Sequence, residues 1–206
     1  MADLTAIDGK LLESARLGAL ADVQRHISAG ADVNCRGQHG MNPLLWASSC
    51  GHLEVVRYLL SHGADVNYTG MREGSPLMLA AYAGQLELMA LYLEYRADVN
   101  LVLPGAGETA LHMAAVKNQT EAAKLLIRAG ADLNRRTNVG VSTDMIEDQL
   151  YGETPLHFAA AYGDRDMIEA MMTAGADKAL TNGKGERPLS YAERAKRPPE
   201  IMDMLR

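Results

Sequence analysis

Apolar residues along this chain come in short groups with helical spacing, and glycine separates one group from the next. After Asn42, which is a favourable cap, Pro43 stands where a first helical residue needs no N–H, so a helix is predicted from Pro43 to Gly51. A second helix is predicted from His52 to Gly63, where five apolar residues approach a 3.6-residue period: Leu53, Val55, Val56, Leu59 and Leu60. Helices this short do not persist alone in water, so they must pack on neighbours.

One closing phrase shows that this two-helix pattern is repeated. Gly-Ala-Asp-Val-Asn, or a close variant of it, ends at Asn34, Asn67, Asn100 and Asn134, and an altered copy occupies residues 175–179. Such a period predicts an array of small units that bury their apolar faces by stacking on one another. The aspartates of the phrase are expected to stabilise its turn: Asp32, Asp65, Asp98, Asp132 and Asp177. Asn118 replaces a glycine that divides two helices, and Arg96 replaces a glycine of the phrase, which suggests a different or strained helix end.

The helix starts carry a second recurring motif, Thr-Pro-Leu-His at Thr154 to His157 and Thr-Ala-Leu-His at Thr109 to His112. Together with the closing phrase, it resembles the ankyrin repeat over about residues 10 to 206. The resemblance implies an all-α solenoid of stacked helix-turn-helix units with β-turn finger loops. It also implies that the threonine and histidine form hydrogen bonds at the helix start. Leu45 and Met78 stand at the histidine position of two repeats and cannot do this, so apolar packing should hold those repeats.

The repeat boundaries predict a single ankyrin-repeat domain over residues 1–206. Residues 10–34 form a partial N-terminal cap repeat and residues 179–206 a C-terminal cap repeat, with four full repeats between them at 35–67, 68–100, 101–134 and 135–178. The last full repeat has an insertion in its finger at about 138–151.

Composition limits the kinds of partner. The formal charge is −6 and basic residues are dense only at Arg135-Arg136 and near Arg194 to Arg197, so nucleic acid is not expected as a ligand. No apolar stretch is long enough to span a membrane, and residues 1–4 do not resemble the start of a secretory signal. Two cysteines do not form a disulfide framework. We therefore expect a cytoplasmic or nuclear protein that is monomeric when unbound.

Candidate chemistry is sparse. His52, His112 and His157 occupy repeat positions, which architecture explains, and no phosphate-binding loop is present, so no catalytic or cofactor-binding residues are predicted. Four residues of metal-ligating types lie within a short span: Cys35, His39, Cys50 and His52. They are divided between a finger and a helix-to-helix turn, which does not match the spacing of a zinc site, so no metal is predicted.

Recognition of a protein or peptide is therefore the expected function, with the chain acting as an adaptor or scaffold. The resemblance implies binding along the concave face and the fingers. Mapped onto this sequence, and with two residues of the insertion added, the predicted partner-binding residues are Arg36, Gln38, His39, Met41, Tyr68, Met71, Arg72, Tyr82, Leu101, Leu103, Lys117, Met145, Tyr151 and Tyr162. Tyr, Met and Arg are enriched at interface centres.

Several alternatives stay open. The apolar finger residues Leu101 to Leu103 either form a binding patch or pack against a neighbouring finger, and the insertion either binds or is a surface loop. A second hypothesis makes the chain a substrate of asparagine hydroxylation at Asn34, Asn67 and Asn100, since their context resembles that of hydroxylated ankyrin asparagines. A third, an enzyme, has no supporting feature.

Overall fold

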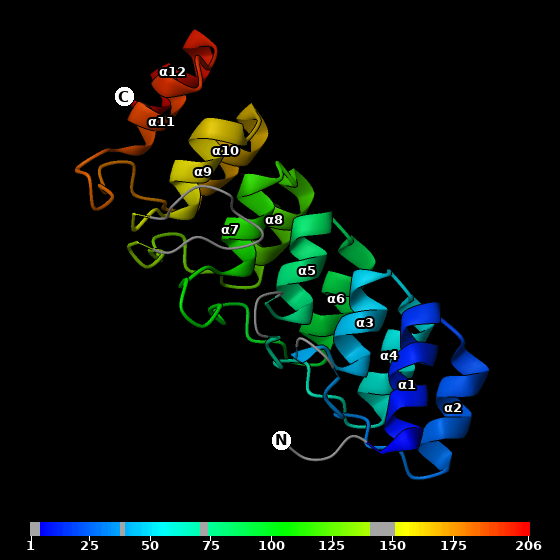
Figure 1. Ribbon diagram of the computed structural model, residues 1–206. Helices are drawn as coiled ribbons and strands as arrows, with labels where there is room; N and C mark the ends of the chain where they lie inside the picture. Colours follow the sequence, from blue (N-terminus) through cyan, green and yellow to red (C-terminus); the bar gives the residue numbers. More distant parts are fainter. Residues whose placement is uncertain (1–4, 38–39, 71–73, 141–150) are drawn as a thin grey trace. The chain divides into compact units, whose positions relative to one another are not determined.

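A computed structural model describes residues 5–37, 40–70, 74–140 and 151–206. These residues form helices joined by turns and loops, with one isolated β-bridge between Val139 and Tyr151 (Figure 1). In those ranges no helix is both long enough and apolar enough to cross a membrane. The all-α repeat fold predicted from the sequence is confirmed. The chain divides into two compact units, which are described separately, and the single-domain arrangement stays a prediction.

Unit 1 comprises Met1–Ala80 and Glu87–Asp98. Within it α1 packs against α2 and α3, while α2 also contacts α4, so that first helices meet first helices and second helices meet second helices. Its elements are α1 (Ala6–Leu17), α2 (Leu20–Ser28), α3 (Pro43–Ser49), α4 (Leu53–Ser61), the start of α5 (Pro76–Ala83) and nearly all of α6 (Leu86–Glu94).

Unit 2 comprises Ala81–Leu86 and Val99–Arg206. The first helices α7, α9 and α11 pack in sequence, and α10 lies between α8 and α12. Apart from the end of α5, its elements are α7 (Ala110–Val116), α8 (Thr120–Arg128), α9 (Pro155–Tyr162), α10 (Arg165–Thr173), α11 (Pro188–Arg194) and α12 (Pro199–Leu205).

Local sequence explains where the helices begin. In α3 the side chain of Asn42 accepts a hydrogen bond from the amide of Leu45 at 2.7 Å, and Pro43 occupies the first turn, as predicted. In α1 Thr5 and Asp8 form a capping box, so the helix begins at Ala6. In α12 Pro199 occupies the first turn.

Helix ends depend on residues in the left-handed conformation. Gly18 and Gly63 have φ of 72° and 88°. Asn118, which replaces a glycine, has φ of 51°, and Arg96 has φ of 62°. Arg96 therefore ends α6 in the left-handed conformation that glycine has in the other repeats, although the Cβ of arginine makes this conformation less favourable in free energy.

The core of each unit consists of apolar side chains at equivalent repeat positions. In unit 1 the large side chains that are almost fully buried include Leu11, Leu44, Leu45, Leu59, Leu77, Met78, Met89 and Tyr92. In unit 2 they include Leu111, Met113, Leu126, Met167, Ile168 and Met171, and several alanines are buried as well. Because adjacent helices bury these faces against one another, each short helix is stabilised by its neighbours.

Candidate protein-binding surface

Threonine and histidine fix the starts of α7 and α9 as the sequence predicted. The Nδ1 atoms of His112 and His157 lie 2.9 Å from the hydroxyls of Thr109 and Thr154, and each accepts a hydrogen bond from the threonine amide at 3.1 Å. With Nδ1 accepting from an amide, Nε2 carries the proton in the neutral ring and donates to a carbonyl of the next finger. These carbonyls belong to Glu153, at 3.3 Å, and Glu186, at 3.0 Å.

Burial keeps these histidines neutral. Both are 0% exposed, and burial lowers the pKa of His112 to about 4 despite the hydrogen bond to the Glu153 carbonyl. The pKa of His157 is lowered for the same reason. Neither ring reaches a site where it could exchange protons with a ligand, so their role is structural.

A buried carboxylate closes the finger before α9. Burial raises the pKa of Glu153, but hydrogen bonds outweigh this and bring it below the ordinary value. The donors to its oxygens are the Tyr191 hydroxyl at 2.6 Å, the Tyr151 amide at 2.7 Å and the Thr137 hydroxyl at 3.1 Å. The finger base before α9 is therefore fixed by a satisfied polar network.

The closing phrase ties successive repeats together. The aspartate side chains accept hydrogen bonds within their own turn at Asp32, Asp65, Asp132 and Asp177, which confirms their predicted role. The asparagines of the phrase have a role that was not predicted: each side chain accepts a hydrogen bond from the backbone amide of the aspartate in the next repeat. In unit 1 Asn34 accepts from Asp65 at 2.9 Å, and in unit 2 Asn100 accepts from Asp132 at 2.7 Å. Hydroxylation of these asparagines stays a prediction.

In unit 2 two predicted partner residues come together at the ends of the first helices. The Lys117 ammonium lies 4.6 Å from the centre of the Tyr82 ring, a cation–π arrangement. Tyr162 ends α9 at the position that Lys117 occupies after α7, and it is 48% exposed. Because α7 and α9 pack against each other, these side chains lie along one edge of unit 2.

Other predicted finger residues make contacts of their own. In unit 1 the Arg36 guanidinium lies 5.0 Å from the Tyr68 ring centre, and the Tyr68 hydroxyl donates to the Gly40 carbonyl at 2.7 Å. In unit 2 the Lys184 ammonium lies 3.4 Å from the centre of the Tyr151 ring. Leu101 and Val102 are half-buried.

Two predicted partner residues do not reach the surface. Met41 is 6% exposed and Leu103 is 3% exposed. Each takes part in the backbone hydrogen bond that closes its finger: the Met41 carbonyl accepts from the Gly37 amide, and the Leu103 amide donates to the Glu108 carbonyl. This burial corrects their assignment to the binding surface. Another five predicted residues lie outside the described ranges: Gln38, His39, Met71, Arg72 and Met145.

The described residues hold no group of three or more His, Cys, Asp and Glu side chains that could bind a metal ion. Cys35 is buried, and burial raises the pKa of its thiol to about 12, whereas Cys50 is exposed. Cys35 is thus a packed side chain with an unreactive thiol.

Family models agree with this architecture. A model described as ankyrin repeats (3 copies) matches residues 11–102 and 72–137, and a model described as ankyrin repeats (many copies) matches residues 114–171. The chain belongs to the ankyrin-repeat family. Ankyrin repeats are generally protein–protein interaction modules, they usually bind protein partners, and these families are typically non-catalytic.

The chain is similar over a short stretch to one protein whose name describes ligand binding. A stretch of 45 residues is 47% identical to acyl-CoA-binding domain-containing protein 4 of Oryza sativa subsp. japonica. The match covers 22% of this ankyrin chain and 13% of that protein. The acyl-CoA binding in its name therefore belongs to that protein and is not assigned to this chain.

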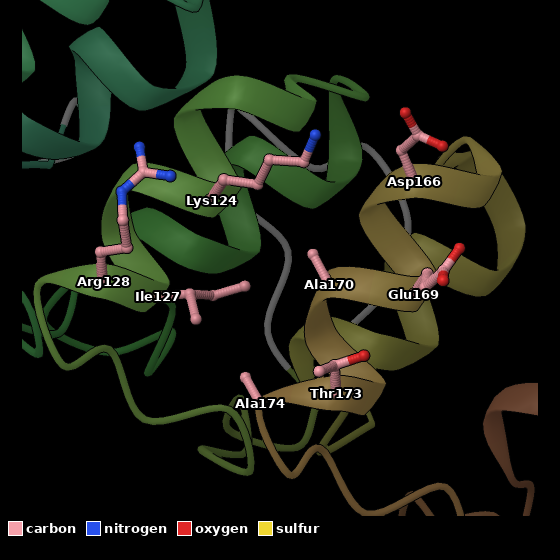
Figure 2. A pocket seen from close by; sticks show the side chains of 8 residues that line it. All are labelled: Lys124, Ile127, Arg128, Asp166, Glu169, Ala170, Thr173 and Ala174. Carbon is pink, nitrogen blue, oxygen red and sulfur yellow. The ribbon is translucent and has the colours of Figure 1, made fainter.

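The structure also shows an open groove that sequence reasoning missed. It lies on the second helices of unit 2, between α8 and α10, with a volume of about 470 Å³ (Figure 2). A sequence signal for it exists: Ala170 stands where α4, α6 and α8 carry Tyr58, Leu91 and Leu125. Sequence reasoning also missed Lys184, which covers Tyr151, and Arg197, which donates to the Ala161 carbonyl at 3.2 Å and so holds the end of α9.

Proposed function

We propose that this chain is a non-catalytic adaptor or scaffold that binds a protein or peptide partner through its finger loops and the exposed side of its first helices. In unit 2 the central contact residues are Tyr82, Lys117 and Tyr162. The single observation that carries the proposal is the exposed Tyr162 in line with the Lys117–Tyr82 pair on packed helices.

The backbone beneath these side chains is held by hydrogen bonds between repeats. The Asp164 amide donates to the Asn118 side chain at 2.7 Å, which joins the turn after α7 to the turn after α9. Arg197 donates to the carbonyls of Ala161 and Gly163, which joins the turn after α9 to the turn after α11. A partner that binds here meets a preorganised edge, so little ordering entropy opposes binding.

The fingers supply the flanking contacts in this proposal. In unit 2 these are the half-buried Leu101 and the Tyr151–Lys184 pair. In unit 1 the Arg36–Tyr68 pair is the corresponding contact. Tyrosine and arginine at such positions have the residue types that dominate interface energies. A cytoplasmic or nuclear location, with the chain monomeric before it binds, belongs to the same proposal.

The test compares proteins captured from a cell extract by the wild-type chain and by Tyr162→Ala. Removal of an exposed ring at an interface centre should reduce capture of a specific partner at least about tenfold. Thermal unfolding should stay nearly unchanged, because Tyr162 is 48% exposed. Quantitative mass spectrometry of the captured proteins measures the effect.

Leu86→Ala is the matched control, since Leu86 is a 40% exposed apolar residue at the start of the second helix α6, away from the first-helix surface. It should leave capture of that partner unchanged. If Tyr162→Ala and Lys117→Glu both capture the same proteins as the wild-type chain in equal amounts, this surface does not bind the partner and the proposal fails.

A further inference from the structure

The α10 wall of the groove between α8 and α10 carries two small residues, Ala170 within the helix and Ala174 directly after it. The backbone hydrogen bonds that end each second helix align the repeats: the Ala64 amide bonds to the Leu59 carbonyl in unit 1, and the Ala176 amide bonds to the Met171 carbonyl in unit 2. In this alignment of repeats Ala170 corresponds to Tyr58 of α4, and Ala174 corresponds to His62. Ala170 and Ala174 therefore each have only a methyl group where Tyr58 of α4 and His62, which follows α4, have a ring.

Unit 1 shows what the larger residues do. Tyr58 and His62 stack on one another, with their ring centres 3.9 Å apart. At the same two positions α10 leaves a hollow of about 470 Å³. Figure 2 shows Ile127 of α8, Ala170 of α10 and Ala174 directly after α10 bordering this hollow, so apolar groups line the space between the helices.

Charged side chains of opposite sign stand on the two walls. Lys124 and Arg128 project from α8, and Asp166 and Glu169 from α10 (Figure 2). Lys124 pairs with Glu121 at 2.9 Å, and Glu169 lies 3.9 Å from Arg165. Glu121, and across the groove Asp166, raise the pKa of Lys124. Within the described residues, the side chains of Arg128 and Asp166 have no ion-pair or hydrogen-bond partner.

Arg128 and Asp166 lie toward opposite ends of the groove. Arg128 is in the last turn of α8, whereas Asp166 is in the first turn of α10, and both line the groove. At 1.5 Å of rise per residue, the seven residues from Asp166 to Thr173 span about 10 Å. The groove therefore combines an apolar centre with a basic end and an acidic end.

We propose that this groove is a second protein-docking site, separate from the first-helix surface. Its occupant is a segment of a partner protein that places an apolar side chain over Ala170, a carboxylate at Arg128 and a basic group at Asp166. Charge complementarity orients the segment along α8 and α10, and the apolar anchor supplies most of the affinity. The site lies on second helices and uses none of the residues of the function proposed above.

The experiment selects binders from a phage-displayed library of random peptides on the full-length wild-type chain. Individual peptides are then measured by fluorescence anisotropy against wild type and variants. Selected peptides should carry an apolar residue between an acidic and a basic residue. Ala170→Tyr, which copies α4, should weaken their binding at least about tenfold because the new ring fills the hollow.

Arg128→Glu should weaken the same peptides about fivefold or more, and exchange of the peptide's acidic residue for lysine should recover the loss. Tyr162→Ala is the control and should have no effect. Ala170→Tyr should leave the melting temperature close to wild type, because α4 already carries a tyrosine there; if it does not fold, Ala170→Leu, the residue type of α6 and α8, replaces it.

Three results would overturn the proposal. One is a library from which no peptide is enriched over an unselected control. Another is a set of peptides that bind the wild type and the filled variant equally, or that respond to Tyr162→Ala instead. The last is concentration-dependent self-association that the filled variant abolishes, which would make a second copy of the chain the occupant. Failure at Ala170 leaves the first-helix surface untouched, since that surface is tested at Tyr162.

Discussion

The finger bases of unit 1 and unit 2 have the same backbone geometry but different chemistry. In unit 1 the Gly37 amide donates to the Met41 carbonyl at 2.8 Å, and in unit 2 the Thr137 amide donates to the Glu153 carbonyl at 2.9 Å. The helix that follows carries Leu45 in unit 1 and His157 in unit 2, both 0% exposed. One unit thus fills this buried position with an apolar side chain, and the other fills it with an imidazole.

The backbone pattern of the finger base accepts either a leucine or a histidine at this position if the buried polar groups have hydrogen-bond partners. A leucine needs only close packing, whereas a histidine needs a partner for each ring nitrogen. His112 has both, through Thr109 and the Glu153 carbonyl. The two solutions should therefore respond differently to mutation and to acid.

The largest difference is expected from loss of the ring of His112. His112→Ala removes a fully buried side chain and its hydrogen bonds, so it should destabilise unit 2 by about 3 kcal/mol or more. His112→Leu, which copies Leu45, keeps most of the volume and should cost about 1 to 2 kcal/mol. Hydrogen exchange in unit 2 peptides during urea unfolding measures both, while fluorescence of Trp46, the only tryptophan, follows unit 1. Equal losses in the two variants would show that the hydrogen bonds outweigh the cavity.

Acid should destabilise unit 2 before unit 1. Burial lowers the pKa of His112 to about 4, whereas histidine titrates near 6.5 in an unfolded chain. The unfolded state therefore binds more protons between these values, and stability falls as pH decreases from about 6.5 to about 4. By pH 4.5 the loss should be about 2 to 3 kcal/mol in unit 2.

Unit 1 has a carboxyl group, Asp8, that responds to acid at lower pH. The hydrogen bond from Thr5 leads the interactions that lower the pKa of Asp8, so its contribution is lost only as pH falls below about 4. Hydrogen exchange at pH 7 and pH 4.5 compares the units. His112→Leu should remove most of the acid response of unit 2, and a response that persists in this variant would assign it to His157 or another group.

The smallest effects concern the helix ends. Arg96 in unit 1 has φ of 62°, and Gly130 at the equivalent place in unit 2 has φ of 89°. Arg96→Gly should stabilise unit 1 by about 0.5 to 1 kcal/mol, because glycine adopts this conformation without steric cost. Gly130→Arg should destabilise unit 2 by about 1 kcal/mol, since a Cβ there meets nothing within 4 Å and only backbone strain remains. Urea midpoints measure both, and opposite signs would mean that the Arg96 side chain makes a compensating contact.

Much of the architecture could be predicted from short-range pattern. The cap at Asn42, the threonine–histidine pairs and the aspartate turns all join residues two or three apart, so the sequence displays both partners side by side. The burial of Met41 and Leu103 could not be predicted in this way. The position of a residue in a finger does not reveal whether its side chain points toward solvent or toward the core. In these two fingers the side chains are buried next to the hydrogen bond that closes the finger.

The candidate sites could also be predicted where they depend on repeat position, but not where they depend on contacts between repeats. Tyr82, Lys117 and Tyr162 follow from repeat positions, but the contact of Lys117 with Tyr82 and that of Lys184 with Tyr151 join separate repeats. Ala170 is visible as a small residue in the repeat alignment. A groove forms at Ala170 only because α10 packs against α8 and no larger side chain fills the space between them.

The repeating helix pairs, their caps and their turns follow from the order of amino acids, because they depend on backbone preferences and on hydrogen bonds between residues close in the chain. The burial of individual side chains, the pairing of rings with cations and the position of the hollow follow from three-dimensional packing. Those outcomes depend on distances between residues of different repeats, and packing alone sets such distances.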